Sequence, residues 1–346
     1  MGKIVDPTEF RGWKYHKYKN RFNYVEWVYM NLVQDDIAAI LTYGVASEFA
    51  PGTVVARIYV GDNVIDIRDY AKNPTILDPS EDDSSIRIDD NSILVNPLDK
   101  DRFYIKGRLA DSKHNLEWNL TYERILPQIN AMDAEPVGWF HNRLFSEWLS
   151  WQVKMPAAKI TGKLNVDGKE YDVNTLGYMD SNWGQWLIID AHWNWLQTCG
   201  MHEGKPYSVA SVEVRNSPSC GDLYVATKDK TLRFFKNKRE FEFRHKEWEE
   251  DKATGHMRPT LTELTGRSLE GYQVELTAKN IMPYALVQNF PAPFGWLAEW
   301  DMLESLVKVE GVVKDPDGRV MFEVDSKGFK EYGTTGWIPG LRRIGL

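Results

Sequence analysis

Carboxylate and amide side chains lie inside a strongly aromatic segment, G-Y-M-D-S-N-W-G-Q-W-L-I-I-D-A-H-W-N-W, which runs from Gly177 to Trp195. Four of the chain's 14 tryptophans fall in this segment. So many bulky apolar groups are expected to be buried, and a buried carboxyl group needs hydrogen-bond partners or becomes neutral. A neutral acid with a raised pKa can protonate an isolated alkene, and each ring face stabilises the carbocation by about 0.5–2 kcal/mol. Asp180 is the candidate for that acid.

The neighbours of Asp180 are candidates for the supporting roles. Tyr178, Trp183 and Trp151 offer ring faces, and Asn182 can hold the carboxyl group or position a water molecule. In a pericyclic reaction the same groups would fold the substrate and hydrogen-bond a carbonyl group, without proton transfer. The structural alternative is a turn in which the Asp and Asn side chains satisfy backbone N–H groups while the Trp packs in the core.

Two Glu–Trp pairs, Glu26-Trp27 and Glu117-Trp118, could add to the wall of a pocket. Side chains alternate between the two faces of a strand, so one member of each pair points inward. We expect the tryptophan inward and the glutamate outward, whereas inward glutamates would be polar pocket groups. The predicted substrate-binding residues are Trp183, Trp151, Glu26, Trp27, Trp118 and Trp195.

Other chemistries have weaker support. Asp190 and His192 share a strand face at i, i+2 and could form an acid–base dyad, but a structural histidine is the favoured interpretation. His245 and Glu249 are four apart and His256 follows, yet no cysteine or further histidine completes a metal site. There is no glycine-rich phosphate loop, nucleophile elbow or dinucleotide fingerprint. We therefore expect neither a metal nor a cofactor.

The elements that must position these residues are β-strands. Runs of β-forming residues are separated by turn residues about every 8–12 positions, as in an all-β sandwich or barrel. Hairpins are predicted around Asp35-Asp36, Asp167-Gly168 and Asp315 to Gly318. Aromatic residues make up 13% of the chain, which suits pleated sheets and apolar pockets.

The segment from Gly177 to Gly184 resembles the G-Y-x-D-H-N-W-G signature of the carotenoid 1,2-hydratase (hydroxyneurosporene synthase) and AttH-like superfamily, which includes kievitone hydratase and lipocalin-like fungal Diels–Alderases. The run E-W-V-Y-M from Glu26 and the spacing W-Q-V-x-x-P-x-A from Trp151 also fit. The resemblance implies two calycin-like (lipocalin-like) antiparallel β-barrel or sandwich domains, with a pocket in or between them. Ser181 stands where the family usually has histidine, so a role of that histidine in proton relay does not carry over.

Both halves of the 346-residue chain are β meanders. The segment from Gly200 to Pro206 is turn-like and marks a seam between them. We expect an N-terminal domain over residues 1–196, which carries the signature, and a C-terminal domain over residues 197–346.

The charge balance disfavours a nucleic-acid partner. The formal net charge is −8, whereas a duplex-binding protein needs a dominant basic face. The basic run from Lys228 to Arg244 is interpreted as two amphipathic strands with a solvated face. The two cysteines, Cys199 and Cys220, are expected to be free thiols. With no signal peptide and no membrane span, we expect a cytoplasmic protein, as a monomer or homodimer.

The sequence thus predicts a cofactor-independent enzyme of the lyase or isomerase class, acting in secondary metabolism. It would hydrate or cyclise a hydrophobic, unsaturated small molecule of isoprenoid or polyketide-like type, with Asp180, Tyr178 and Asn182 as catalytic residues. Two alternatives stay open. One is a pericyclic cyclase that shapes its substrate, and the other is a lipid or pigment carrier without catalysis, which the Ser181 departure keeps open.

Overall fold

The computed structural model is built almost entirely from β-strands. It describes residues 24–46, 52–70, 85–96, 98–135, 148–185, 192–215, 217, 220–250, 257–282, 286–291 and 299–336. In these ranges the only regular element that is not a strand is the short 3-10 helix η1 (Lys236–Lys238). Contacts divide the chain into two compact units, one of Met1–Ala134 with Leu149–Trp186 and the other of Glu135–Trp148 with Leu187–Leu346. The boundary expected between residues 196 and 197 stays a prediction.

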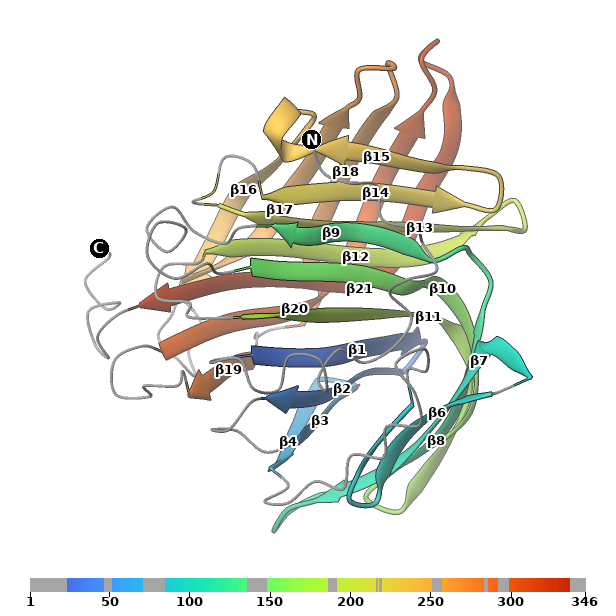
Figure 1. Ribbon diagram of the computed structural model, residues 1–346, viewed down its shortest axis with the longest axis vertical. Helices are drawn as coiled ribbons and strands as arrows, with labels where there is room; N and C mark the ends of the chain where they lie inside the picture. The colour runs from blue at the N-terminus through green and yellow to red at the C-terminus, as the bar shows by residue number, and fades with distance from the viewer. Residues whose placement is uncertain are drawn as a thin grey trace. The chain divides into compact units, whose positions relative to one another are not determined.

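The first sheet has 11 strands, in the order β4-β3-β2-β1-β11-β10-β8-β7-β6-β5, with β9 paired to β10. Its neighbouring strands pair antiparallel, as β1 does with β2 and β11 and β10 with β8, and the sheet is curled (Figure 1). Its strands are β1 (Tyr24–Gln34), β2 (Ile37–Ala46), β3 (Thr53–Val60), β4 (Asn63–Tyr70), β5 (Ile86–Ile88), β6 (Asn91–Asn96), β7 (Asp99–Ala110), β8 (Asn115–Arg124), β9 (Ile129–Glu135), β10 (Trp148–Val166) and β11 (Lys169–Gln185).

One face of this sheet carries a large apolar cluster, called here the first core. On β1 it takes alternate residues, Val28, Met30 and Leu32, and on β11 it includes Met179. Burying each such side chain stabilises the fold by about 1.5–3 kcal/mol. The strict alternation shows which face of each strand points inward, and it therefore assigns a face to every neighbouring residue.

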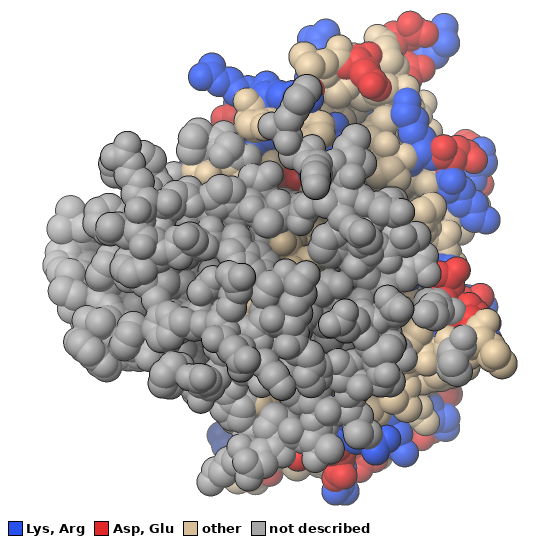
Figure 2. Space-filling view, in the orientation of Figure 1, with Lys and Arg blue, Asp and Glu red and all other residues tan. Residues whose placement is uncertain are grey.

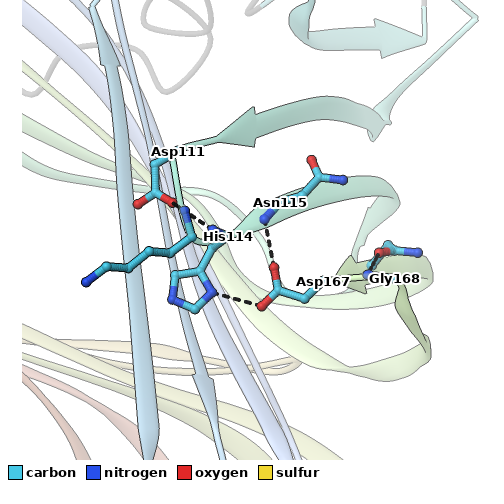
Figure 3. Close-up of polar contacts among 7 residues, drawn as sticks. Asp111, His114, Asn115, Asp167 and Gly168 are labelled. Atoms are coloured by element: carbon cyan, nitrogen blue, oxygen red, sulfur yellow. Dashed lines mark hydrogen bonds and ion pairs between the residues drawn. The ribbon is translucent and has the colours of Figure 1, made fainter.

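The hairpin of β10 and β11 is the element that carries the signature segment. Its turn, Asp167-Gly168, has positive φ angles of 53° and 84°, as a type I′ turn requires. The Asp167 carboxylate accepts the N–H of Asn115 at 2.7 Å and lies 2.8 Å from Nδ1 of His114 (Figure 3). In the neighbouring turn the Asp111 carboxylate accepts the N–H of His114 at 2.7 Å. These contacts join the two turns and hold the register of β10 against β8; the predicted hairpin is confirmed.

The second sheet repeats the strand order of the first. It has 10 strands, in the order β15-β14-β13-β12-β21-β20-β18-β17-β16, with β19 paired to β20. Its strands are β12 (Trp193–His202), β13 (Lys205–Val214), β14 (Gly221–Thr227), β15 (Thr231–Phe235), β16 (Phe241–Glu250), β17 (Met257–Arg267), β18 (Gln273–Asn280), β19 (Leu286–Pro291), β20 (Glu299–Lys314) and β21 (Val320–Gly336). Its inner face carries a second apolar cluster, here the second core, which includes Leu196, Phe243, Leu264 and Val309. The predicted all-β fold with two lipocalin-like sheets is confirmed.

The basic run forms the predicted pair of amphipathic strands, β15 and β16, joined by η1. Two of its arginines have acidic partners: Arg233 pairs with Asp222 at 2.8 Å, and Arg244 with Glu242 at 2.7 Å. In the view of Figure 2, the described Lys and Arg side chains lie among Asp and Glu side chains.

Two further predictions concern the cysteines and the membrane-spanning segments. Neither Cys199 nor Cys220 is in a disulfide, so both are thiols as predicted. Among the residues whose placement is described, no helix has the length and apolar character needed to cross a membrane.

Candidate active site

Asp180 is buried at the centre of a hydrogen-bonded group. Only 2% of its surface is exposed. Its Oδ2 accepts the indole N–H of Trp151 and the hydroxyl of Tyr178, each at 2.8 Å. Its Oδ1 faces Nδ2 of Asn182 at 3.4 Å, a longer and weaker contact. Three residues chosen from the sequence as partners of Asp180 thus contact its carboxyl group directly.

The pairing of β1 with β11 places further polar groups beside this carboxyl group (Figure 1). Tyr29 lies opposite Asp180, and Asn31 lies opposite Tyr178. The rings of Tyr29 and Tyr178 meet edge to face with centroids 6.4 Å apart. Asn31 donates to the Tyr29 hydroxyl at 3.4 Å. Tyr29 and Asn31 were not selected from the sequence, although Asn31 interrupts an apolar run and so carried a signal.

These residues lie on the face of the first sheet that points away from the first core. Asp180 and Tyr178 alternate with Met179, which belongs to the first core. Asn182 and its partner across the ladder, Trp27, share the Asp180 face. The candidate site is therefore separate from the apolar interior of this sheet.

A row of directly opposed residues extends this face across the sheet. From Tyr178 the pairings lead to Asn31 on β1, then to Ile40, Arg57 and Asp66 on β2, β3 and β4. The Arg57 side chain has no exposed surface and lies 3.4 Å from Asp66. Three strand spacings separate β3 from β11, about 14 Å. The row places a buried guanidinium on the Asp180 face, at a distance that a polycyclic or chain-like molecule could span.

The orientation predicted for Glu26 and Trp27, with the tryptophan inward and the glutamate outward, is wrong. Glu26 is 2% exposed and shares the face of the first core, while Trp27 is partly buried on the Asp180 face. Burial of the Glu26 carboxyl group is offset by the Tyr24 hydroxyl, which donates to its Oε2 at 2.9 Å. That partner lies two residues away on the same strand face, a pairing that hydrophobicity alone does not reveal.

For the second pair the prediction is confirmed. Glu117 is exposed and Trp118 belongs to the first core, where its indole N–H donates to the Tyr43 hydroxyl at 2.9 Å. Trp183 lies opposite Glu26, on the face of the first core as well. Trp195 lies on β12, in the second sheet. Of the residues predicted from the sequence, Trp151, Tyr178 and Asn182 contact Asp180 directly, and the substrate-binding roles stay predictions.

Ser181 points to the opposite face from Asp180. It is buried opposite Val28, a residue of the first core. A side chain at this position is therefore directed toward the apolar interior of the sheet and away from the Asp180 carboxyl group.

The structure describes only part of the other acid–base and metal candidates. Asp190 and His256 lie outside the described residues. His245 and Glu249 lie on β16, a strand and not a helix. Within the described part of the chain, no group of three or more His, Cys, Asp or Glu side chains is arranged to hold a metal ion.

The fold is shared with solved structures of low sequence identity. The chain is similar to a putative AttH from Nitrosomonas europaea, with a TM-score of 0.64 and 14% identity over 97% of this chain and 98% of that one. It is also similar to kievitone hydratase from Nectria haematococca, with a TM-score of 0.63 and 14% identity over 96% and 93%. For CghA in complex with Sch210972, the TM-score is 0.62 and the identity is 13%, over 91% of this chain and 89% of that one.

These structures match the superfamily that the segment from Gly177 to Gly184 resembles, so that prediction is confirmed at the level of the fold. No protein-family model matches the sequence. No curated protein matches it either.

Proposed function

We propose that this protein is an enzyme that hydrates or cyclises a hydrophobic, unsaturated small molecule by acid catalysis, with Asp180 as the acid. The observation that carries this proposal is the buried Asp180 carboxyl group, which is hydrogen-bonded by aromatic side chains through one oxygen. Kievitone hydratase is a hydratase by name and shares the fold, which supports the reaction class.

The hydrogen bonds of Asp180 favour one of its two carboxyl oxygens as the carrier of the acidic proton. An indole N–H can only donate, so Oδ2 of Asp180 must accept from Trp151. We assign the acidic proton of a neutral carboxyl group to Oδ1, which faces Asn182, because Oδ2 already receives the two shorter hydrogen bonds. As this proton moves to the alkene, negative charge develops on the carboxylate. Trp151 and Tyr178 are already in place to stabilise that charge on Oδ2.

The remaining steps of hydration and of cyclisation involve only the substrate, water and the Asp180 carboxyl group. Protonation of the alkene by Oδ1 leaves a carbocation, which either water or a second double bond of the substrate attacks. In hydration, the oxonium ion formed returns a proton to the Asp180 carboxylate. In cyclisation, the carboxylate removes a proton from the new cation. The ring of Tyr178 is held at the carboxyl group, where its π face could stabilise the cation.

The test compares Asp180→Asn and Asp180→Ala with the wild type on a panel of unsaturated isoprenoid and polyketide-type compounds. In D2O, acid catalysis places solvent deuterium on carbon in the product, which mass spectrometry detects. Both variants are expected to lose turnover by at least about 10²-fold. Wild-type rates in both variants would refute the role of Asp180.

A pericyclic reaction is the second candidate, because one face of the sheet offers several polar groups to a substrate carbonyl. Tyr29, Asn31 and Arg57 lie on that face together with Tyr178. Hydrogen bonds from such groups would activate a carbonyl-bearing substrate, and no proton would be transferred to carbon. A product without deuterium would support this candidate, and an unchanged ligand across the whole panel would support the carrier.

A further inference from the structure

A second polar group lies on the inner face of the second sheet. Lys330 on β21 donates to the carbonyl of Pro259 at 2.8 Å and to Oγ1 of Thr262 at 3.2 Å. Thr262 Oγ1 lies 3.0 Å from Nδ1 of His245, and Nε2 of His245 lies 3.1 Å from Oδ1 of Asn194. Asn194 then donates to Glu213 at 2.7 Å. Lys330 is 3% exposed, so the group reaches into the buried part of this sheet.

The directions of these hydrogen bonds follow from Glu213. A carboxylate only accepts, so the amide nitrogen of Asn194 faces Glu213 and its oxygen faces His245. His245 therefore carries its proton on Nε2. Its Nδ1 can then accept the hydroxyl hydrogen of Thr262, which in turn accepts from Lys330. Burial lowers the pKa of His245 to about 4, with smaller effects of Lys330 and Arg215, in agreement with a neutral imidazole.

Two cations of this group have no carboxylate within ion-pair distance among the described residues. Within the described ranges, the ammonium group of Lys330 donates to the carbonyl of Pro259 and the hydroxyl of Thr262. Arg215 donates to the hydroxyl of Tyr332 at 2.6 Å and to the carbonyl of Gly333 at 2.9 Å, and its guanidinium lies 4.0 Å from the Tyr332 ring centroid. Both raise the positive potential at His245.

The nearby carboxylates already have cationic partners. Glu213 pairs with Lys236 at 3.2 Å, and Glu249 pairs with Arg258. Among the described side chains, Lys330 and Arg215 therefore have no carboxylate of their own within ion-pair distance. Buried charges are normally paired, so a positive excess at half-buried and buried positions favours an anion.

Aromatic rings form the outer end of the same group. His245, Trp248 and Tyr332 lie mutually edge to face, with centroids 5.2–5.3 Å apart. Trp248 is 42% exposed, so this end reaches the protein surface. Lys330 and Tyr332 share one face of β21 at i, i+2. An exposed aromatic end thus adjoins two cations without carboxylate partners.

We propose that this end of the second sheet binds an organic anion. The carboxylate or sulfonate group of the ligand lies by Arg215 and Lys330, and its apolar body packs on Trp248 and Tyr332. All of these residues belong to the second unit, so the proposal does not rest on the function of Asp180.

The test uses 8-anilinonaphthalene-1-sulfonate, which combines one sulfonate with an aromatic body. Calorimetric titration of the wild type at pH 6.5 is compared with titrations of Lys330→Met and Arg215→Met. Lys279→Met, which removes an exposed lysine of β18, is the matched control. Loss of one charged contact is expected to weaken binding by about 10–100-fold in each test variant. The control and Asp180→Asn keep wild-type affinity.

Equal dissociation constants for the wild type, both test variants and the control would overturn the proposal, as would absence of binding to the wild type. A thermal unfolding scan of each variant shows whether it is folded. If Lys330→Met is unfolded, Arg215→Met alone decides the outcome, because the more exposed Arg215 is the less disruptive change.

Discussion

Trp151 donates its indole N–H to Oδ2 of Asp180 at 2.8 Å. The two residues lie on β10 and β11, the long strands of one hairpin. The tryptophan therefore acts as a hydrogen-bond donor to the candidate acid as well as an aromatic wall. This relationship distinguishes catalysis at Asp180 from simple packing, because the donor can be removed while the ring is kept.

Trp151→Phe is expected to lower kcat by about 10–100-fold with little change in KM. The substitution keeps an aromatic ring but removes a hydrogen bond to a group that becomes charged, worth about 1.5–3 kcal/mol. Steady-state kinetics on the turned-over substrate measure the effect. Trp193→Phe is the matched control, because it removes an indole hydrogen bond to Glu331 in the second sheet and should leave kcat unchanged. A wild-type kcat in Trp151→Phe would contradict the proposed role.

Gly177→Ala is expected to destabilise the fold by about 1–3 kcal/mol, because the added methyl group would overpack the surroundings of residue 177. A Cβ atom at Gly177 would overlap the carbonyl oxygen of Asn31 and Cδ1 of Ile160. Gly44→Ala is the control, since a Cβ there has its nearest neighbours at 3.7 Å. Urea unfolding measures both variants. Equal stabilities would show that the first glycine of the signature is not required by packing.

The stability of the protein is expected to rise with pH between 7 and 9 because of Lys330. Burial, with a smaller effect of Arg258, lowers the pKa of Lys330 to about 7 from an ordinary value of 10.5. Between these values the unfolded chain binds the proton and the folded chain does not, so the folded state gains as pH rises. Over this range the gain is up to about 2–3 kcal/mol.

Urea unfolding at several pH values measures this dependence. Among the described residues, Arg258 is the charge that acts on Lys330, and the titratable His245 is connected to Lys330 through Thr262. Lys330→Met should remove the slope between pH 7 and 9. The same slope in wild type and variant would assign the dependence to another group.

His245, in the same hydrogen-bonded group as Lys330, is expected to set how the stability falls at acidic pH. Its pKa is lowered to about 4 from 6.5, mainly by burial. The unfolded chain therefore takes up the proton first as pH falls, and stability is lost between pH 6.5 and 4. His245→Gln should lose less stability than the wild type over this range in urea unfolding. A larger loss in the variant would contradict the assignment.

The local sequence pattern was sufficient to predict the strands, the hairpins and the group of polar residues around Asp180. Period-2 alternation places Tyr178, Asp180 and Asn182 on one face of a strand whatever the rest of the chain does. Asp167-Gly168 specifies a type I′ turn through its own backbone preferences. The segment from Trp148 to Val153 begins β10, while residues 136–147 lie outside the described ranges.

Only the tertiary structure decided which faces meet. The pairing of β1 with β11 joins residues about 150 positions apart and brings Tyr29 beside Asp180. The same pairing places Glu26 on the face of the first core and directs Ser181 away from the acid. Lys330, Thr262 and His245 come from three separate strands of the second sheet. No local signal reports such contacts, because the register of each ladder depends on which face of the whole curled sheet is buried.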